Sequence, residues 1–442
     1  MALTGARTYV GFGFGAIQAG LFLYEAYRSG NFGRLVVAEV IPDLVSNLRR
    51  AGGYYTLNIA HPDWIEPVRI GPVEINDPSV AADRERQVAA LAEAHEIGTA
   101  IPSVTFYQSS GPGSLHRLLA DGLRRKAANG GPPAVVYAAE NHNHAAEILE
   151  AAVLGEIPAA EHNRIRARVQ FLNTVIGKMS GVISEPDTIR ERGLATTTAQ
   201  DRRAFLVEAF NRILISRIQS HADDRGSPFR RGIEVFEEKQ NLLPFEEAKL
   251  YGHNATHALA AYVGALAGAQ RFTDLGTVPG ALPFLRAAFL QESGGALVRK
   301  HAGVDPLFTR QGYARYADDL LARMTNPYLL DTVDRVGRDP ARKLGWNDRL
   351  VGTMRLALDQ GIEPRRYAYG AAAALAALDR SILEQSYPAP ALLDPLWRSA
   401  SPPREEREVM IGRIESGLRQ LGAWRDSGFK NLERLFEDES DA

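Results

Sequence analysis

At 442 residues the chain is too long for one ordinary domain, and its length predicts two or three. A hydrophobic fraction of 45% with 24% charged residues excludes a mostly disordered chain. The absence of cysteine excludes disulfides, thiolate metal sites and cysteine nucleophiles, and a net charge of −2 argues against a general nucleic-acid binder. No leader is recognisable, and no apolar run reaches the roughly 20 residues of a membrane span. We therefore expect a cytoplasmic protein with neither nucleic-acid nor membrane partners.

The first third of the chain alternates between short apolar runs and helix-like stretches. The expected strands are Thr8–Phe12, Leu35–Val40, Val68–Ile75 and Pro133–Ala139. The expected helices are Ala16–Arg28, Ala81–His95 and Ser114–Asn129. Strands and helices in this alternating order predict a doubly wound, mostly parallel α/β sheet.

After about residue 200 the sequence is almost continuously helix-like. The expected helices are Arg202–Gln219, Pro244–Leu266, Ala281–His301, Gly312–Met324, Asn347–Gln360, Arg366–Ser381 and Glu405–Leu421. We predict an α/β nucleotide-binding domain over residues 1–200 and an all-α, multihelical domain over residues 201–442. The sequence indicates no role for the tail after about residue 385.

A glycine cluster follows the first expected strand. Gly11, Gly13 and Gly15 precede Ala16 and Ile17, and the pattern can be counted from Gly11 as GxGxxA or from Gly13 as GxGxxQxG. Glycines between a strand and a helix permit a tight turn and let a diphosphate approach the helix N-terminus. The alternative is a glycine-rich turn that binds nothing.

An acidic residue ends the second expected strand. Glu39 lies 26 residues after Gly13, slightly beyond the usual spacing of about 20 in dinucleotide-binding folds. A carboxylate there accepts the ribose hydroxyls of an adenosine and repels a 2′-phosphate. Together with the glycines, Glu39 favours NAD as cofactor.

A polar cluster, Glu140-Asn141-His142-Asn143-His144, follows another expected strand. Ligands of open α/β sheets bind beyond the carboxyl ends of the strands, so Asn141 is placed to donate a hydrogen bond to a substrate oxygen. Two histidines two residues apart could also be metal ligands. We disfavour a metal site because the sequence contains no cysteine and no second cluster of ligands.

The densest segment is Phe245-Glu246-Glu247-Ala248-Lys249, followed by Asn254 and His257. On an α-helix, Lys249 and His257 lie about 80° apart, and Asn254 and His257 about 60° apart, so they share one broad face. A lysine in a dry pocket loses its proton more readily and can act as general base toward an alcohol. Asn254 would stabilise the alkoxide and His257 would hold a hydroxyl. The alternative is a solvated helix face with one core histidine.

A basic run follows at residues 335–343, where four cations occur in nine residues: Arg335, Arg338, Arg342 and Lys343. Such a run can clamp a phosphate or carboxylate. Alone, it is equally typical of a solvated surface.

These segments together resemble the long-chain mannitol dehydrogenase family, and within it the mannitol-1-phosphate 5-dehydrogenase branch. The resemblance rests on Lys-x4-Asn-x2-His at Lys249, Asn254 and His257, and on the segments at residues 291–295, 326–329, 334–338, 342–344 and 348–350. It covers most of residues 8–380. Gln18 and Ala19 depart from the glycine and arginine expected in the phosphate branch, and the segment at residues 99–103 differs as well.

The resemblance implies an N-terminal Rossmann domain, a helical C-terminal domain with the active site between them, and metal-independent hydride transfer with NAD. It implies that Lys249 is the general acid/base, that Asn141 and Asn254 stabilise the oxyanion, and that His257 binds a substrate hydroxyl. It further implies proton relay by Glu246. The remaining implied residues, which bind substrate, are Arg335, Arg338, Arg342 and Lys343.

The expected function is therefore NAD-dependent interconversion of D-mannitol 1-phosphate and D-fructose 6-phosphate, by a monomer or small homo-oligomer. One alternative is a polyol 2-dehydrogenase or hexuronate reductase of the same family. Another is an NAD-binding protein without catalysis, which the intact Lys249, Asn254 and His257 set disfavours.

Overall fold

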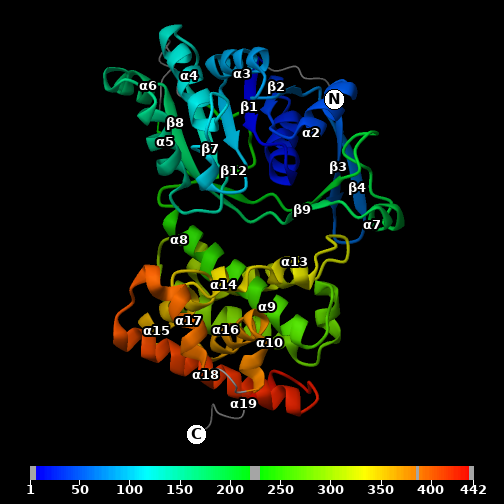
Figure 1. The fold of residues 1–442 in the computed structure, drawn as a ribbon, viewed down its shortest axis with the longest axis vertical. Coiled ribbons are helices and arrows are strands. Elements are labelled where there is room, and N and C mark those ends of the chain that lie inside the picture. The colour runs from blue at the N-terminus through cyan, green and yellow to red at the C-terminus, as the bar shows by residue number, and fades with distance from the viewer. Residues whose placement is uncertain (1–5, 220–228, 385–387, 438–442) are drawn as a thin grey trace. The chain divides into compact units, whose positions relative to one another are not determined.

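The computed structural model describes residues 6–219, 229–384 and 388–437. The chain forms two compact units, Met1–Leu243 and Pro244–Ala442. Figure 1 shows the strands gathered in the first unit, and the described residues of the second unit form helices joined by loops. The expected combination of a mostly parallel α/β domain and a helical domain is confirmed.

The main sheet of the first unit has eight strands in the order β12-β11-β8-β7-β6-β1-β2-β5. Their bounds are β1 Arg7–Phe12, β2 Phe32–Ala38, β5 Glu74–Asn76, β6 Glu96–Thr99, β7 Ala134–Ala138, β8 Val169–Ile176, β11 Ile213–Ser216 and β12 Phe236–Lys239. The six neighbouring strands β5, β2, β1, β6, β7 and β8 run parallel to one another, and β11 pairs with β8 antiparallel. Because β2 and β6 lie on opposite sides of β1, the strand order reverses there, which is where such sheets bind ligands.

Helices cover both faces of this sheet. They are α1 Tyr24–Ser29, α2 Pro42–Arg50, α3 Ala81–Glu93, α4 Leu115–Ala128, α5 Ala145–Gly155 and α6 His162–Arg166, with short 3-10 turns η2 Val104–Phe106 and η3 Ala159–Glu161. A further helix of this unit, α7 Pro186–Glu191, follows β8 in the chain. One apolar core lies under α3, α4 and α5, and a second joins the other face to the helix after β1.

A second, four-stranded sheet was not predicted. Its order is β4-β3-β10-β9, with bounds β3 Tyr55–Ala60, β4 Ile65–Ile70, β9 Ser180–Ile183 and β10 Ala204–Glu208. The helix expected over Arg202–Gln219 is wrong, because this stretch forms β10 and β11. Each strand is short and apolar, and such runs cannot be told from helix by periodicity; pairing with β3 and β8 decides them.

The predicted domain boundary at residue 200 falls inside the first unit, because β10, β11 and β12 complete its two sheets. The strand expected over Val68–Ile75 is also divided between the two sheets, into β4 and β5.

The second unit is built from helices throughout the part of it that the structure describes. The α-helices are α8 Leu243–Glu247, α9 Ala255–Leu266, α10 Ala281–Ala287, α11 Gly294–Lys300, α12 Arg310–Met324, α13 Val333–Gly337, α14 Pro340–Lys343, α15 Val351–Asp359, α16 Arg365–Leu378, α17 Ala389–Trp397, α18 Arg404–Asp426 and α19 Arg434–Glu437. The short 3-10 segments are η5 Phe272–Thr277, η7 Pro306–Phe308, η8 Arg380–Glu384 and η9 Arg398–Ala400.

Helix α16 is the buried centre of this unit. It packs against α9 and α18, and its small residues allow close approach: a Cβ at Gly370 would lie 2.5 Å from Leu259 Cδ1. Its N-terminus is closed by the buried Glu292, whose oxygens accept the backbone N–H groups of Arg366 (2.8 Å) and Tyr367 (3.0 Å). Burial raises the pKa of Glu292 to about 7 despite these donors.

Residues 388–437, for which the sequence indicated no role, contribute to this core. Trp397 and Trp424 are fully buried, and Trp397 Nε1 donates to the backbone oxygen of Leu344 at 2.7 Å. Helix α17 therefore holds the backbone of Leu344, the residue that directly follows the basic run.

Among the described residues, three helices contain a π-helical turn, in which the backbone N–H bonds to the carbonyl five residues earlier. These segments are η1 Gln18–Leu23, η4 Ala248–Asn254 and η6 Ala288–Ser293. The first follows the glycine cluster, and the second carries the predicted catalytic lysine.

Candidate active site

The glycine cluster forms the turn that the sequence predicts. Gly13 has φ +80°, and its N–H donates to the Ala38 carbonyl at 2.8 Å. A Cβ at Gly13 would lie 2.8 Å from Ala100 O, so only glycine fits this backbone. A Cβ at Gly15 would meet nothing within 4 Å, which leaves open space beside the start of the helix. This is the arrangement that a diphosphate requires.

The other glycine of the pattern lies inside β1 and has a packing role. A Cβ at Gly11 would lie 2.1 Å from Nε2 of Gln18, whose buried amide donates to Tyr9 Oη at 2.8 Å. Ala16 and Ile17 begin the helix, with Ala16 buried and Ile17 partly buried. Counting from Gly13 therefore describes the open side of the turn better than counting from Gly11.

Glu39 joins the end of β2 to the glycine turn. Its Oε2 accepts the Phe14 N–H at 2.6 Å, and its Oε1 accepts those of Val40 (2.7 Å) and Ile41 (2.9 Å). A carboxylate offers about four acceptor positions, so Glu39 retains room for roughly one further donor. The residue is 5% exposed and lines the neighbouring cavity, so a ribose hydroxyl can reach it there.

A cavity of about 580 Å³ opens beyond the carboxyl ends of β1, β2 and β6. Its apolar walls include Ile101, Phe106 and Leu118, and its polar lining includes Glu39 and Ser114. Ser114 precedes α4, and its buried hydroxyl has no hydrogen-bond partner among the described residues. An apolar slot with a few polar groups is typical of a cofactor pocket. Ser114 was not predicted as a site residue, because a serine before a helix is ordinarily a cap.

The polar cluster after β7 divides into a buried and an exposed part. Glu140 accepts the Thr99 hydroxyl (2.8 Å), the Ile101 N–H (3.0 Å) and the Tyr107 hydroxyl, and it thereby shapes the loop along the cavity. Burial raises the pKa of Glu140 in spite of these donors. Asn141 is the first exposed residue after it, at the carboxyl end of the sheet.

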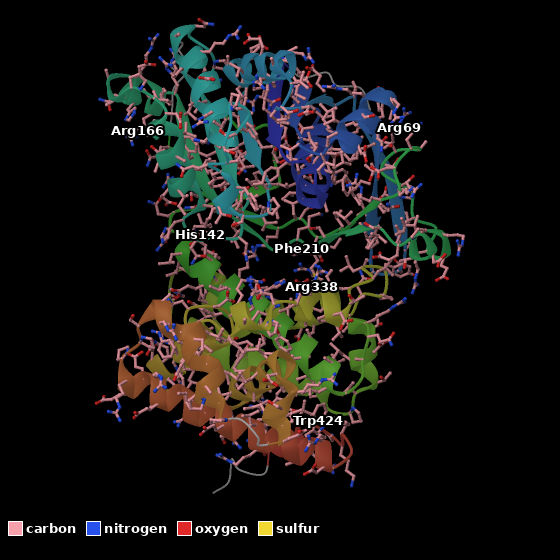
Figure 2. The ribbon with its side chains drawn as sticks, viewed as in Figure 1. Arg69, His142, Arg166, Phe210, Arg338 and Trp424 are labelled. Atoms are coloured by element: carbon pink, nitrogen blue, oxygen red, sulfur yellow. The ribbon has the colours of Figure 1, made fainter. Side chains whose placement is uncertain are left out.

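His142 and His144 are exposed, with ring centroids 6.2 Å apart, and Figure 2 labels His142 in the first unit. No group of three metal-ligating side chains occurs among the residues described.

The π-helical segment changes the geometry expected for the lysine motif. In an α-helix, residues five apart such as Lys249 and Asn254 would differ by about 140° around the axis. The π turn over Ala248–Asn254 is bonded between residues five apart, which brings Lys249 and Asn254 to the same side of the helix. His257 follows on α9 and is partly buried. The π turn thus brings Lys249 and Asn254 nearer in angle than a regular helix would, and the grouping of both with His257 stays a prediction.

The environment of Lys249 favours loss of its proton. Burial and the nearby Arg349 guanidinium lower the pKa of Lys249 to about 8, against the opposing charge of Glu246. Glu246 lies on α8 just before the π turn, whereas Glu247 pairs with Lys300 (2.8 Å) and His301 (2.7 Å). Of the two glutamates, Glu246 is the one whose charge acts on Lys249.

His257 has an acidic neighbour that sequence reasoning missed. Its Nε2 lies 3.3 Å from Asp331 Oδ2, and Arg335 binds both oxygens of Asp331 at 2.7 Å. Burial opposes ionisation of Asp331, but His257 and Arg335 hold its pKa at about 2. The carboxylate thus orients the two predicted substrate-binding residues together. Asp331 could have been identified from its position four residues before Arg335, because oppositely charged residues at that spacing can pair.

The basic run does not form one uniform cluster. Arg342 pairs with Asp339 at 2.9 Å, and Arg338, labelled in Figure 2, is exposed with Nε donating to the Arg335 carbonyl. Lys343 is buried beside the Tyr262 ring and donates to the Arg338 carbonyl. Burial and the charges of Arg349 and Arg342 lower the pKa of Lys343 to about 8.

Within the described part of the chain, no helix is both long enough and apolar enough to span a membrane.

Comparisons with known proteins agree with this architecture. Residues 7–225 match the family model of the mannitol dehydrogenase Rossmann domain, and residues 241–404 match that of the mannitol dehydrogenase C-terminal domain. The chain is similar in fold to mannitol 2-dehydrogenase of Pseudomonas fluorescens, solved as a ternary complex with NAD and D-mannitol (18% identity, 98% of this chain and 95% of that chain, TM-score 0.71).

It is likewise similar to a D-sorbitol dehydrogenase solved without substrate (15% identity, 96% of this chain and 94% of that chain, TM-score 0.72). The two family models together span both units, and the resemblance seen in the sequence is confirmed at the level of the family. The chain belongs to the mannitol dehydrogenase family, with the family's Rossmann domain followed by its C-terminal domain.

Proposed function

We propose that this protein is an NAD-dependent, metal-independent oxidoreductase that interconverts D-mannitol 1-phosphate and D-fructose 6-phosphate. The observation that carries the proposal is Lys249, whose pKa is lowered to about 8 on a π turn that aligns it with Asn254. A lysine with such a pKa exchanges its proton near neutral pH, as a general acid/base must.

The first unit has the features that NAD requires. Gly13 makes the turn, Gly15 leaves the helix start open, and Glu39 lines a cavity large enough for an adenosine. The negative charge of Glu39 favours a free ribose over a 2′-phosphate. When bound, NAD would supply the hydride acceptor for alcohol oxidation.

The second unit would supply the proton chemistry. In alcohol oxidation, neutral Lys249 takes the proton of the reacting hydroxyl while Asn254 donates its amide hydrogen to the same oxygen. In ketone reduction, protonated Lys249 returns the proton. His257 would hold a neighbouring hydroxyl, with Asp331 fixing its ring. Glu246 stays the predicted proton relay, and Asn141 the predicted second amide donor.

The choice of a phosphorylated substrate is supported by the cations of the second unit. A neutral polyol would leave the buried Lys343, which donates to a backbone carbonyl, without an anion, whereas a phosphate or carboxylate would neutralise it. A polyol 2-dehydrogenase is the second candidate, because both structural neighbours are named for neutral polyols. A hexuronate reductase would use the same cations for a carboxylate.

The test of the function is NADH consumption with D-fructose 6-phosphate, D-fructose and D-fructuronate measured side by side. We expect rapid turnover with the phosphate alone. Turnover with D-fructose or D-fructuronate instead would move the protein to the corresponding alternative. Silence with all three, and with a broader panel of ketoses and polyols, would contradict the assignment and support a non-catalytic NAD-binding protein.

The role of Glu39 leads to a prediction about cofactor binding. Glu39→Gln should weaken NADH binding by roughly 100-fold. The carboxylate accepts three backbone N–H groups that shape the glycine turn and has room for a ribose hydroxyl, and an amide has too few acceptor positions to bind all four donors. Fluorescence titration with NADH measures the Kd. Glu74→Gln is the control, since Glu74 is an exposed carboxylate paired with Arg34. An unchanged Kd in Glu39→Gln would contradict this role.

A further inference from the structure

We propose that Arg349 binds the anionic group of the substrate and so makes this enzyme selective for a phosphorylated sugar. The inference rests on the proposed function and deepens it, because Arg349 lies outside the basic run that the sequence singles out. Three observations carry it: the anchoring of Arg349 to the lysine segment, its incomplete neutralisation, and the surrounding excess of cations.

Arg349 is anchored to the segment that carries Lys249. It lies just before α15, and the Thr353 hydroxyl bridges the carbonyl oxygens of Arg349 (2.5 Å) and Tyr251 (3.0 Å). Tyr251 belongs to the π turn of Lys249. A Cβ at Gly352 would lie 2.6 Å from the Tyr251 ring, so the start of α15 is pressed against that turn. The position of Arg349 relative to Lys249 is therefore fixed.

Arg349 has only part of its hydrogen-bonding capacity used. Its side chain is 12% exposed, and its Nε donates to Asp348 Oδ1 at 2.8 Å. Asp348 is also shared with Arg342, whose Nη1 lies 3.7 Å from its second oxygen. Arg335, by contrast, is bound through two nitrogens to Asp331. The two terminal nitrogens of Arg349 have no protein carboxylate partner among the described residues, although a guanidinium presents five donors.

Arg349 also lies within a group of cations, with Lys249, Arg342 and Lys343, that outnumbers the acids acting on it, which are Glu246, Asp339 and Asp348. Its charge contributes to lowering the pKa values of both Lys249 and Lys343, which each fall to about 8. Lys343 donates to a carbonyl rather than to a carboxylate. A planar guanidinium with free terminal nitrogens beside a buried ammonium is suited to a phosphate or carboxylate. A neutral sugar would leave this positive charge unmatched.

The test compares Arg349→Gln with Arg355→Gln in the full chain. Arg355 is a matched control on α15, where its guanidinium stacks on Trp346 (4.5 Å) and donates to Asn347 (2.8 Å). We expect Arg349→Gln to lower kcat/KM for D-fructose 6-phosphate by roughly 100-fold, mainly through KM, because charge-assisted bonds to the anion are lost. Slow turnover of D-fructose should change by less than about threefold on the same reasoning. Arg355→Gln should match wild type with both.

A pH profile separates anion binding from simple loss of structure. Removing the Arg349 charge should raise the apparent pKa that Lys249 imposes on turnover, since that charge helps to lower it. Arg349→Lys keeps the charge and loses the planar fork, so it should retain the wild-type apparent pKa while still showing a raised KM. The lysine variant also serves if Arg349→Gln fails to fold.

The outcomes are distinct. A wild-type KM for the phosphate in Arg349→Gln, or equal losses with D-fructose 6-phosphate and D-fructose, would overturn the inference. A selective loss with D-fructuronate would support anion binding and identify a carboxylate as its source. If none of the sugars tested supports NADH oxidation by the wild-type protein, the proposed function is contradicted, and this outcome alone does not decide the role of Arg349. Calorimetric titration with inorganic phosphate then decides the inference: binding lost in Arg349→Gln supports it, and equal binding contradicts it.

Discussion

Lys249→Ala is expected to reduce turnover by about a thousandfold or more while leaving the NADH Kd unchanged. The estimate follows from the usual contribution of a positioned general acid/base, about 10²–10⁴ in rate. No residue in the described part of the second unit other than Lys249 combines a place beside Asn254 with a pKa near 8. The cofactor half of the reaction is assigned to the first unit, so NADH binding should persist. Steady-state rates and NADH fluorescence titration measure the two properties separately.

Lys430→Ala is the control for this variant, because Lys430 is an exposed lysine after α18. The pH dependence of the wild-type enzyme is an independent check. Alcohol oxidation needs neutral Lys249 and should rise as pH passes about 8, whereas ketone reduction needs the ammonium and should fall over the same range. Wild-type-like turnover in Lys249→Ala, or the same pH trend in both directions, would refute the mechanism.

Glu292→Ala is expected to lower the free energy of unfolding of the second unit by about 3 kcal/mol near pH 5. Two backbone N–H groups at the start of α16 would lose their acceptor inside the core, at about 1–3 kcal/mol each. Arg366, whose Nη1 lies 3.7 Å from Glu292, would lose a neighbour as well. Because α16 packs against both α9 and α18, the loss should reach the whole unit.

The loss in Glu292→Ala should shrink as pH rises. The folded pKa of Glu292, about 7, lies above the ordinary value of 4.5, so its stabilising contribution is complete below about pH 4.5 and is lost as pH passes 7. Urea unfolding followed by tryptophan fluorescence measures this, since Trp346, Trp397 and Trp424 all lie in the second unit. Glu408→Ala is the exposed-carboxylate control. An unfolding midpoint equal to wild type at pH 5 would show that Glu292 does not hold α16.

Much of the fold could be predicted where periodicity was long and clear. The helices Ala81–Glu93 and Leu115–Ala128 and the strand Ala134–Ala138 lie within two residues of their expected bounds. The strands Ala204–Glu208 and Ile213–Ser216 could not be recognised, because runs of three or four apolar residues fit a helix face as well as a strand. Their structure is decided by partners more than 35 residues away in sequence, β3 and β8.

The candidate site was predictable in its chemistry and less so in its geometry. The motif at Lys249 identifies the reacting groups, but nothing in the residue types predicts the π turn that aligns Lys249 with Asn254. Asp331 and Arg349 were missed for a different reason: the contact of Asp331 with His257 and the effect of Arg349 on Lys249 join residues that the fold brings near, and only the pairing of Asp331 with Arg335 is local in sequence. A count of cations in the basic run could not show that Arg342 is already paired while Arg349 has free donors.

The π turn also sets a limit on how this segment tolerates insertions and deletions. A π segment is equivalent to an α-helix that has gained one residue, and only that extra residue brings positions five apart into line. Deleting Leu250 would restore a regular helix and still leave the lysine one turn from the asparagine. The loss of one residue is therefore absorbed by the turn, and the residues of α8 before it keep their phase against α9. The gain of a further residue has no such outlet, because it would rotate every residue before it by about 100° against α9. The buried side of α8, with Phe245 and Glu246, would then turn away from its core, so this segment should tolerate a one-residue deletion far better than a one-residue insertion.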